Sequence, residues 1–179
     1  MDNIGLKKIA LLCGSTKHTF GGVWSCDNFP KINKRSGKKQ KLAKQCRVTK
    51  FQIINSAPSN TSGQHWLLLI AINIHETERV FVWDCLGRPI SFYDHFHERL
   101  IKLYGRATGA FTTVKLTLQN VSSNLCGLYC LYLVHYLVRY PFIALKLHKI
   151  NTLLQTTEID VVRFFNQKIT GAIFKYSII

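Results

Sequence analysis

An almost unbroken apolar run covers residues 125–138 and follows a polar, turn-forming stretch at residues 120–124. A loop that leads directly into a buried helix produces this pattern. The run ends before Arg139 and Pro141, well short of the ~20 apolar residues that a membrane-spanning helix needs. The pattern therefore predicts a buried helix, and we expect no membrane partner.

Shorter apolar or alternating segments upstream of that helix predict a β-sheet. They are rich in β-branched and aromatic side chains, and polar or charged turns separate them. The predicted strands cover residues 51–55, 66–74, 80–83 and 110–118. A polar loop at residues 56–63 joins the first two strands, and a charged turn at residues 75–79 joins the next two.

Helical patterns lie mainly towards the ends of the chain. Further helices are predicted at residues 4–13, 91–104, 142–150 and 158–169, with Ser91 and Thr157 as N-caps of the second and the last. Glycines within residues 20–24 indicate a turn beside aromatic anchors. Because no composition break divides the chain, we expect a single α+β domain over residues 1–179, with a central, mostly antiparallel sheet packed against the buried helix.

The chain also has a large excess of positive charge. The chain carries 24 Lys or Arg and 9 Asp or Glu, a net charge of +15, and nine of the basic residues lie in residues 31–50 without any acid. Charge runs are usually solvated surface, but this density exceeds what solubility requires and predicts a basic arm for a polyanion, first of all DNA. The arm has no aromatic side chain for base stacking, so contacts to phosphates are expected. The predicted DNA-binding residues are Lys34, Arg35, Lys38, Lys39, Lys41 and Lys44.

The cysteines are scattered along the chain at Cys13, Cys26, Cys46, Cys85, Cys126 and Cys130. Their spacing matches neither a zinc site nor the disulfide framework of a small secreted protein. The N-terminus has no long hydrophobic region of the signal-peptide type. We therefore expect reduced thiols, no metal, and an intracellular protein that is not secreted.

Cys126 falls in the first turn of the predicted buried helix. Free N–H groups and the positive end of the helix dipole stabilise an anion there, which favours a thiolate nucleophile. Gly127 beside it allows another backbone to approach closely. Taken alone, a cysteine in such a helix is more often a small core residue, which is what we expect of Cys130 one turn deeper.

A histidine and an aspartate favour the catalytic interpretation of Cys126 over a role as a core residue. His65 immediately precedes the strand at residues 66–74 and Asp84 ends the returning strand, so both fall at the same end of one antiparallel ribbon. If Cys126 packs at that end, a Cys-His-Asp arrangement results, with His65 as proton acceptor and Asp84 fixing the imidazole tautomer. Gln119 offers a side-chain N–H that, with the backbone N–H of Cys126, forms an oxyanion hole. Each residue alone has an ordinary structural explanation, whereas the order and spacing together are specific.

This combination resembles the adenovirus-type cysteine proteases, including those of the virus-like Maverick/Polinton DNA transposons, and more distantly the SUMO-deconjugating proteases. The resemblance rests on Gly63-Gln64-His65-Trp66, Asp84-Cys85-Leu86-Gly87, Gln119 with Cys126-Gly127-Leu128-Tyr129-Cys130, and residues 20–30. It implies an adenain-like fold with a papain-like site. In that site Cys126 is the nucleophile, His65 the base, Asp84 the orienting acid and Gln119 the oxyanion donor.

The resemblance also implies a substrate cleft and a preference for small residues, chiefly glycine, near the cut. The implied substrate-binding residues are Gly21, Gly22, Trp24 and Trp66. Two features depart from the adenovirus enzymes, which have a glutamate where Asp84 stands and a cysteine that joins an activating peptide through a disulfide. Residues 108–114 contain no cysteine, so the resemblance does not imply covalent activation by a peptide in this chain. The resemblance also implies no role for the basic arm.

The leading hypothesis is a thiol endopeptidase that processes virion or virus-like structural precursors, such as capsid proteins. We expect a monomer in the host nucleus or the virion, with DNA as the candidate activator and no other cofactor. One alternative is a ubiquitin-like or SUMO-type deconjugating isopeptidase. A second is a basic nucleic-acid-binding virion protein without activity, against which the intact set of Cys126, His65, Asp84 and Gln119 argues.

Overall fold

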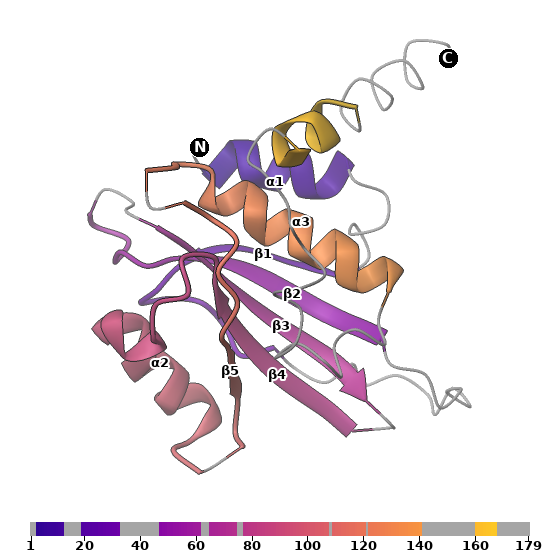
Figure 1. Cartoon of the computed structure of the whole chain (residues 1–179). Coiled ribbons are helices and arrows are strands. Elements are labelled where there is room, and N and C mark those ends of the chain that lie inside the picture. The colour runs from indigo at the N-terminus through magenta and orange to yellow at the C-terminus, as the bar shows by residue number, and fades with distance from the viewer. Residues whose placement is uncertain are drawn as a thin grey trace.

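The computed structural model describes residues 3–12, 19–32, 47–61, 65–74, 77–107, 109–120, 122–140 and 160–167. These residues form an α+β domain in which helices lie on both faces of a five-stranded sheet (Figure 1). The predicted fold class is confirmed. The helix predicted at residues 142–150 and the cap Thr157 lie outside the described residues, whereas residues 160–167 are helical within the predicted segment 158–169.

The sheet has the strand order β1-β2-β3-β4-β5. Its strands are β1 (Phe20–Ser25), β2 (Arg47–Asn55), β3 (Trp66–Ile74), β4 (Thr77–Asp84) and β5 (Thr112–Val114). The two central pairings, β2 with β3 and β3 with β4, are antiparallel as predicted. Both edge pairings are parallel. On the β5 side the reason is the crossover through α2 (Asp94–Tyr104), because parallel neighbours need such a connection.

The glycine segment at residues 20–24 forms the edge strand β1, so its prediction as a turn was wrong. Its pairing with β2 shifts register between Phe20 and Val23, and Gly22 has a φ of 113°. A Cβ atom on Gly22 would lie 2.7 Å from Trp24 Nε1, which leaves room only for glycine. The glycines therefore permit an irregular strand, and Trp24 folds back to donate a hydrogen bond to the Gly21 carbonyl at 3.0 Å.

Four boundaries also differ from the predicted ones. Residues 77–79, predicted as part of a turn, form the start of β4. The basic segment does not extend as a loop to residue 50, because Arg47–Asn55 forms β2. Ser91 is not a helix cap: it lies in the short 3-10 helix η1 (Ile90–Phe92), and α2 begins at Asp94 after Tyr93. The strand predicted at residues 110–118 is shorter, since β5 ends at Val114 and the N–H groups of Leu118 and Gln119 bond to the Cys85 carbonyl instead.

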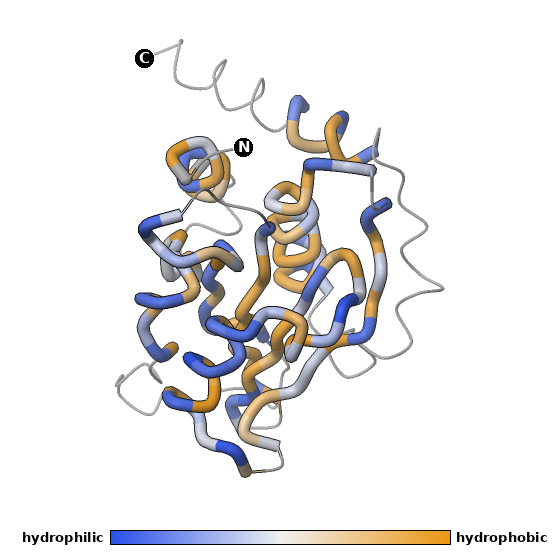
Figure 2. Tube along the Cα trace, turned by 90° about the vertical axis from the view of Figure 1, so that its left-hand side faces the viewer, coloured by the Kyte–Doolittle hydropathy of each residue, from blue (hydrophilic) through white to orange (hydrophobic). Residues whose placement is uncertain are grey.

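Two apolar layers enclose the sheet. α3 (Cys126–Arg139) and α1 (Asn3–Leu12) cover one face, and α2 covers the other (Figure 1). Side chains of β3 alternate between these layers, with Leu68 facing α3 and Leu67 facing α2. The whole of β3 is buried as a result, and hydrophobic residues concentrate along the central strands and α3 (Figure 2). None of the described helices is long and apolar enough to cross a membrane.

Candidate active site

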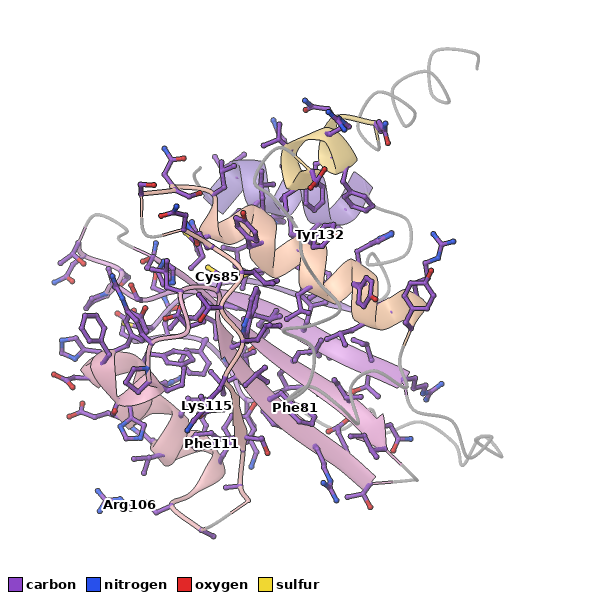
Figure 3. All side chains as sticks on the ribbon, in the orientation of Figure 1. Phe81, Cys85, Arg106, Phe111, Lys115 and Tyr132 are labelled. Carbon is purple, nitrogen blue, oxygen red and sulfur yellow. The ribbon has the colours of Figure 1, made fainter. Side chains whose placement is uncertain are left out.

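The residues predicted to be catalytic converge on one end of the sheet. His65 stands directly before β3, and the register that pairs Leu67 with Asp84 places the end of β4 beside it. Gln119 reaches the same end because its N–H bonds to the Cys85 carbonyl at 3.0 Å. Cys85 lies where this end of the sheet meets α3, the helix that begins at Cys126 (Figure 3).

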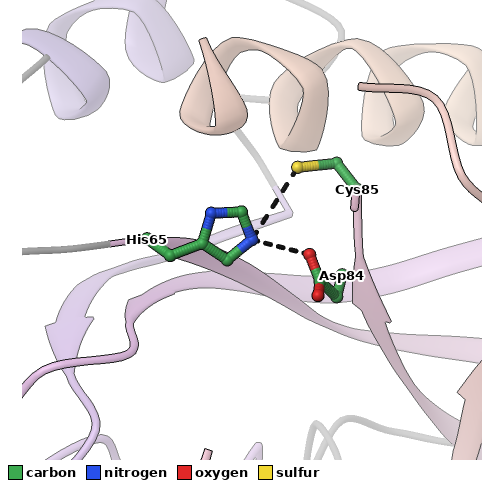
Figure 4. A group of neighbouring side chains, drawn as sticks. All are labelled: His65, Asp84 and Cys85. Carbon is green, nitrogen blue, oxygen red and sulfur yellow. Dashed lines mark hydrogen bonds and ion pairs between the residues drawn. The ribbon is translucent and has the colours of Figure 1, made fainter. Parts of the chain in front are cut away.

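His65 and Asp84 form a buried pair. Nε2 of His65 lies 2.6 Å from Oδ1 of Asp84, and the two side chains are 8% and 1% exposed (Figure 4). The other ring nitrogen points away from Asp84, towards the side on which α3 lies (Figure 4). The tautomer and orientation of the imidazole are therefore fixed by one short contact to a carboxylate.

Three further donors hold the Asp84 carboxylate. The N–H of Leu86 donates to Oδ1 at 2.9 Å, and the N–H of Arg88 donates to Oδ2 at 3.1 Å. The Tyr93 hydroxyl donates to Oδ2 at 2.8 Å. Burial by itself raises the pKa of Asp84, but the hydrogen bonds with His65, Leu86 and Tyr93 and the positive charge of His65 hold that pKa below its usual value. Asp84 is thus kept as an anion beside the histidine.

Tyr93 was not predicted as part of the site. Besides its bond to Asp84, its ring stacks on the His65 ring, with centroids 5.8 Å apart and an interplanar angle of 11°. The sequence held no specific signal for it, because an aromatic residue in a predicted helix is usually a packing residue. Its contribution depends on the fold of residues 84–93, which returns the chain to the end of β4.

Cys126 and His65 shift each other's pKa in opposite directions. Burial alone raises the pKa of the Cys126 thiol, but the hydrogen bond to His65, its positive charge and the N–H groups of Trp66 and Gly127 lower it overall. Burial alone lowers the pKa of His65, but the hydrogen bonds and charges of Asp84 and Cys126 raise it to about 9. This arrangement favours a thiolate beside an imidazolium.

Gln119 is buried beside these residues. Its Nε2 atom donates to the Ser123 carbonyl at 2.6 Å, and its Oε1 atom accepts from Cys85 Sγ at 2.6 Å. An amide has two N–H groups on Nε2, so one remains for another acceptor. Cys85 and Ser123 were not predicted to hold this side chain, because the sequence does not indicate which groups a buried amide contacts in the folded chain.

Two other thiols lie near the histidine and differ from Cys126 in chemistry. Cys85 Sγ is 4.0 Å from His65 Nε2, but burial and the nearby charges of Cys126 and Asp84 raise the pKa of Cys85 far above its usual value. Cys130 Sγ donates to the Trp66 carbonyl at 3.7 Å, and full burial likewise raises its pKa. Of the three, only Cys126 has a lowered pKa.

The comparison with known families fits this geometry. The family model described as adenovirus endoprotease matches residues 42–170, which contain His65, Asp84, Gln119 and Cys126. The chain belongs to the adenovirus endoprotease family. It is therefore a cysteine-type endopeptidase that acts on protein substrates. No match was found among curated proteins. α1 and β1 precede the matched residues, so the family match does not bear on the N-terminal segment.

A metal is not needed to explain the cluster at the site of this protease. His65, Asp84 and Cys85 each offer one ligand atom, and these atoms lie within 4.8 Å of one another. The same atoms are engaged in hydrogen bonds, with Asp84 Oδ1 on His65 and Cys85 Sγ on Gln119. The predicted absence of a metal remains a prediction.

The residues predicted to bind substrate occupy two different places in the protease. Trp66 is buried in the layer under α3, and its backbone N–H contacts Cys126. Trp24 is partly buried in the layer under α2 and pairs with Ile54 in β2. Register places Trp24 in one row with Ile54, Leu67 and Asp84, so the tryptophan backbone lies three strand spacings, about 14 Å, from Asp84. Gly21 and Gly22 lie further from the site along β1, and substrate contacts by all four residues remain predictions.

All six predicted DNA-binding residues of the protease lie outside the described residues. The two ends of the basic segment are described. Lys31 lies over the Tyr104 ring, with Nζ 5.3 Å from its centroid, and the neighbouring Ile32 N–H donates to the Tyr104 hydroxyl. At the other end, Arg47 opens β2 opposite Asn73. DNA binding therefore remains a prediction from charge, and the structure shows only where the two ends of the basic segment join the domain.

Proposed function

We propose that Cys126, His65 and Asp84 form the catalytic triad of this cysteine endopeptidase and that Gln119 stabilises the oxyanion. The buried contact of His65 Nε2 with Asp84 Oδ1 at 2.6 Å, at the end of the sheet where α3 begins with Cys126, carries this proposal. The opposite pKa shifts of Cys126 and His65 support it, because they favour a nucleophilic thiolate and a proton donor in one site. The hydrogen bond that His65 Nε2 donates to Asp84 leaves Nδ1 to face the nucleophile.

The proposed reaction proceeds in two stages. The Cys126 thiolate attacks the scissile carbonyl carbon, and the negative charge on the substrate oxygen is held by the Gln119 amide and the Cys126 backbone N–H. His65 gives its Nδ1 proton to the leaving amine, and a thioester to Cys126 remains. His65 then takes a proton from water, whose oxygen attacks the thioester and releases the second product. Asp84 stabilises the imidazolium in both stages and stays ionised.

We propose virion or virus-like structural precursors as substrates, cleaved beside glycine or other small residues. Membership of the adenovirus endoprotease family supports this substrate class. The competing substrate is a di-glycine-tailed ubiquitin-like conjugate, because the same triad hydrolyses an isopeptide bond. Parallel assays with capsid-type linear peptides and with ubiquitin-like or SUMO conjugates separate the two. Faster cleavage of the conjugates would contradict the precursor assignment.

We propose further that DNA assists the protease through the basic segment at residues 31–50. The ends of this segment support a function separate from the chemistry. Asn55, at the end of β2 that holds the site, pairs with Trp66. Arg47 lies eight residues away along the same strand, which is about 26 Å at ~3.3 Å per residue. DNA held there would raise the local concentration of protein and substrate without contacting the triad.

A peptide probe with a thiol-reactive group tests the proposed site. We expect labelling at Cys126, located by mass spectrometry of the digested protein, and loss of peptide hydrolysis in a folded Cys126→Ala variant. Cys130→Ala is the matched control, since Cys130 lies one turn further along the same helix and is fully buried. Equal loss of hydrolysis in both folded variants, or labelling at Cys85, would overturn the assignment. The same assays with and without DNA test the assistance.

A further inference from the structure

We infer that Cys85 is a positioning residue that orients the Gln119 side chain as an oxyanion donor. The inference rests on the proposed role of Gln119. It also gives a function to a buried thiol that the proposed reaction does not otherwise use.

Cys85 holds Gln119 at two points. Its carbonyl accepts hydrogen bonds from the backbone N–H groups of Leu118 and Gln119 at 2.9 and 3.0 Å. These bonds hold the segment that follows β5 beside the site. Its Sγ atom lies 2.6 Å from Gln119 Oε1. One residue thus fixes both the backbone and the side chain of Gln119, and it does so from the position next to Asp84. The two halves of the site are connected through these adjacent residues.

The neighbours of the Gln119 amide determine which way it faces. The Ser123 carbonyl can only accept, so the NH₂ group must lie towards it, as the 2.6 Å contact from Nε2 indicates. Oε1 then faces Cys85, whose thiol supplies the donor. A flipped amide would set two oxygens against each other at Ser123 and would present a lone pair where the substrate oxyanion needs an N–H. The Ser123 carbonyl therefore selects the orientation that leaves the second N–H of Nε2 for substrate, and the Cys85 thiol holds Oε1 in that orientation.

Only a protonated thiol can act in this way. A thiolate has no proton to give to Oε1 and would repel it. Cys85 is fully buried, and the charges of Asp84 and Cys126 lie close by, so its pKa is raised and it stays protonated while Cys126 ionises. Two thiols near the same imidazole are thereby assigned different tasks, one as nucleophile and one as hydrogen-bond donor.

Substitutions at Cys85 test this inference by steady-state hydrolysis of a peptide substrate. Cys85→Ala removes the donor, Cys85→Val removes it while nearly filling the same space, and Cys85→Ser keeps a donor. We expect the first two to lower kcat by about 10–100-fold with little change in KM, the size of effect expected when a reacting group is misplaced. Cys85→Ser should recover most of the activity. Cys26→Ala is the control, because Cys26 is an equally buried thiol in the layer under α2.

A double-substitution cycle separates positioning from a general structural effect. Gln119→Ala should lower kcat by about 10²–10³-fold, the usual loss for one oxyanion donor. If Cys85 acts through Gln119, adding Cys85→Val to Gln119→Ala causes no further loss. Alkylation of Cys126 by a haloacetamide should keep its rate and pH midpoint in every Cys85 variant, since that reaction forms no oxyanion.

Each outcome of the cycle decides a different claim. If Gln119→Ala lowers kcat but Cys85→Val does not, or if the two losses multiply, the inference about Cys85 is wrong and the oxyanion role stands. If Gln119→Ala leaves kcat within about threefold, the oxyanion role itself fails, and the inference fails with it. Should Cys85→Ala not fold, the comparison of Cys85→Val with Cys85→Ser gives the same decision.

Discussion

His65 Nε2 lies 2.6 Å from Asp84 Oδ1, and both side chains are buried at the end of the same β-hairpin. This contact occupies one ring nitrogen and turns the other towards α3 (Figure 4). Because the carboxylate also accepts bonds from Leu86, Arg88 and Tyr93, it cannot rotate freely. The pair is thus held in place before any substrate binds, and its energetics can be tested residue by residue.

Asp84→Asn should leave the fold intact and lower kcat by roughly 10²–10⁴-fold. The amide has nearly the same shape, but it carries no charge to stabilise the imidazolium and can present an N–H to His65, which selects the wrong tautomer. Peptide hydrolysis measures the loss, and circular dichroism checks the fold. A folded variant with kcat close to that of the unaltered protease would show that Asp84 does not orient the histidine.

Tyr93→Phe removes one donor from Asp84 while keeping the ring that stacks on His65. A hydrogen bond to a buried charged group contributes about 1.5–3 kcal/mol, so we expect the free energy of unfolding to fall by that amount. Denaturant unfolding at neutral pH measures the change. Tyr136→Phe is the matched control, because the described residues provide no hydrogen-bond partner for its hydroxyl. Equal destabilisation of the two variants would contradict the contribution of the Tyr93 hydroxyl.

The pKa shifts predict different pH profiles for alkylation and hydrolysis. The pKa of Cys126 is lowered, so alkylation of Cys126 by a haloacetamide should persist well below the ~8.5 of an unperturbed thiol. The pKa of His65 is raised to about 9, and hydrolysis needs its proton, so hydrolysis should fall as the pH rises through that value. Alkylation should continue there, because a thiolate reacts without the imidazolium. A midpoint near 8.5 for Cys126 alkylation would refute the ion pair.

The raised pKa of His65 also predicts how the contribution of this residue to the free energy of unfolding changes with pH. Its folded-state pKa of about 9 exceeds the ~6.5 of an unfolded histidine, so the protonated form is favoured by folding. The contribution is fully present below pH ~6.5 and is lost as the pH rises through about 9. Denaturant unfolding of the protease and of His65→Ala between these pH values measures it. A stability difference that grows with pH would have the wrong sign.

Gly127→Ala tests how the N-terminal helix packs beside the nucleophile. A Cβ atom on Gly127 would lie 2.6 Å from Leu6 Cδ2 of α1, and Leu6 is fully buried. Overpacking of this kind costs about 1–3 kcal/mol, which outweighs the ~1 kcal/mol that alanine gains over glycine in a helix. We therefore expect destabilisation. In a Leu6→Ala background the clash is absent, and the same substitution should stabilise instead. If the sign does not reverse, α1 does not contact α3 at this position.

Replacing Lys34, Arg35, Lys38 and Lys39 by Ser tests the basic arm. Binding that neutralises Z phosphates weakens with salt at a log–log slope of about −0.9Z, so use of half the arm gives a slope of roughly −4. The variant should show a flatter slope and less stimulation by DNA. Hydrolysis of a short peptide without DNA should stay unchanged. Unchanged DNA affinity and salt dependence would mean that a polyanion contacts another face.

Some of the structure was decided locally. Residues 66–74 form β3 as predicted, and α3 begins at Cys126 within the apolar run. In both cases an apolar pattern bounded by polar residues matches the periodicity of a buried element. The approach of His65 to Asp84 was also predictable, because two strands joined by a short turn are adjacent and antiparallel, which brings the outer ends of the hairpin together. Local order along the chain was sufficient for these features.

Other features depended on contacts between distant segments. The glycines of β1 adopt a strand because β2 offers a hydrogen-bonding edge, and no pattern within residues 20–25 indicates that edge. Tyr93 reaches Asp84 only after the chain turns at η1, and Cys85 meets Gln119 across 34 positions of sequence. The periodicity of burial depends on residues that are neighbours along the chain, whereas the partner of a buried polar atom depends on how the whole domain packs. The sequence alone determined which residues are proposed to carry the chemistry, and the tertiary structure decided which residues hold them in place.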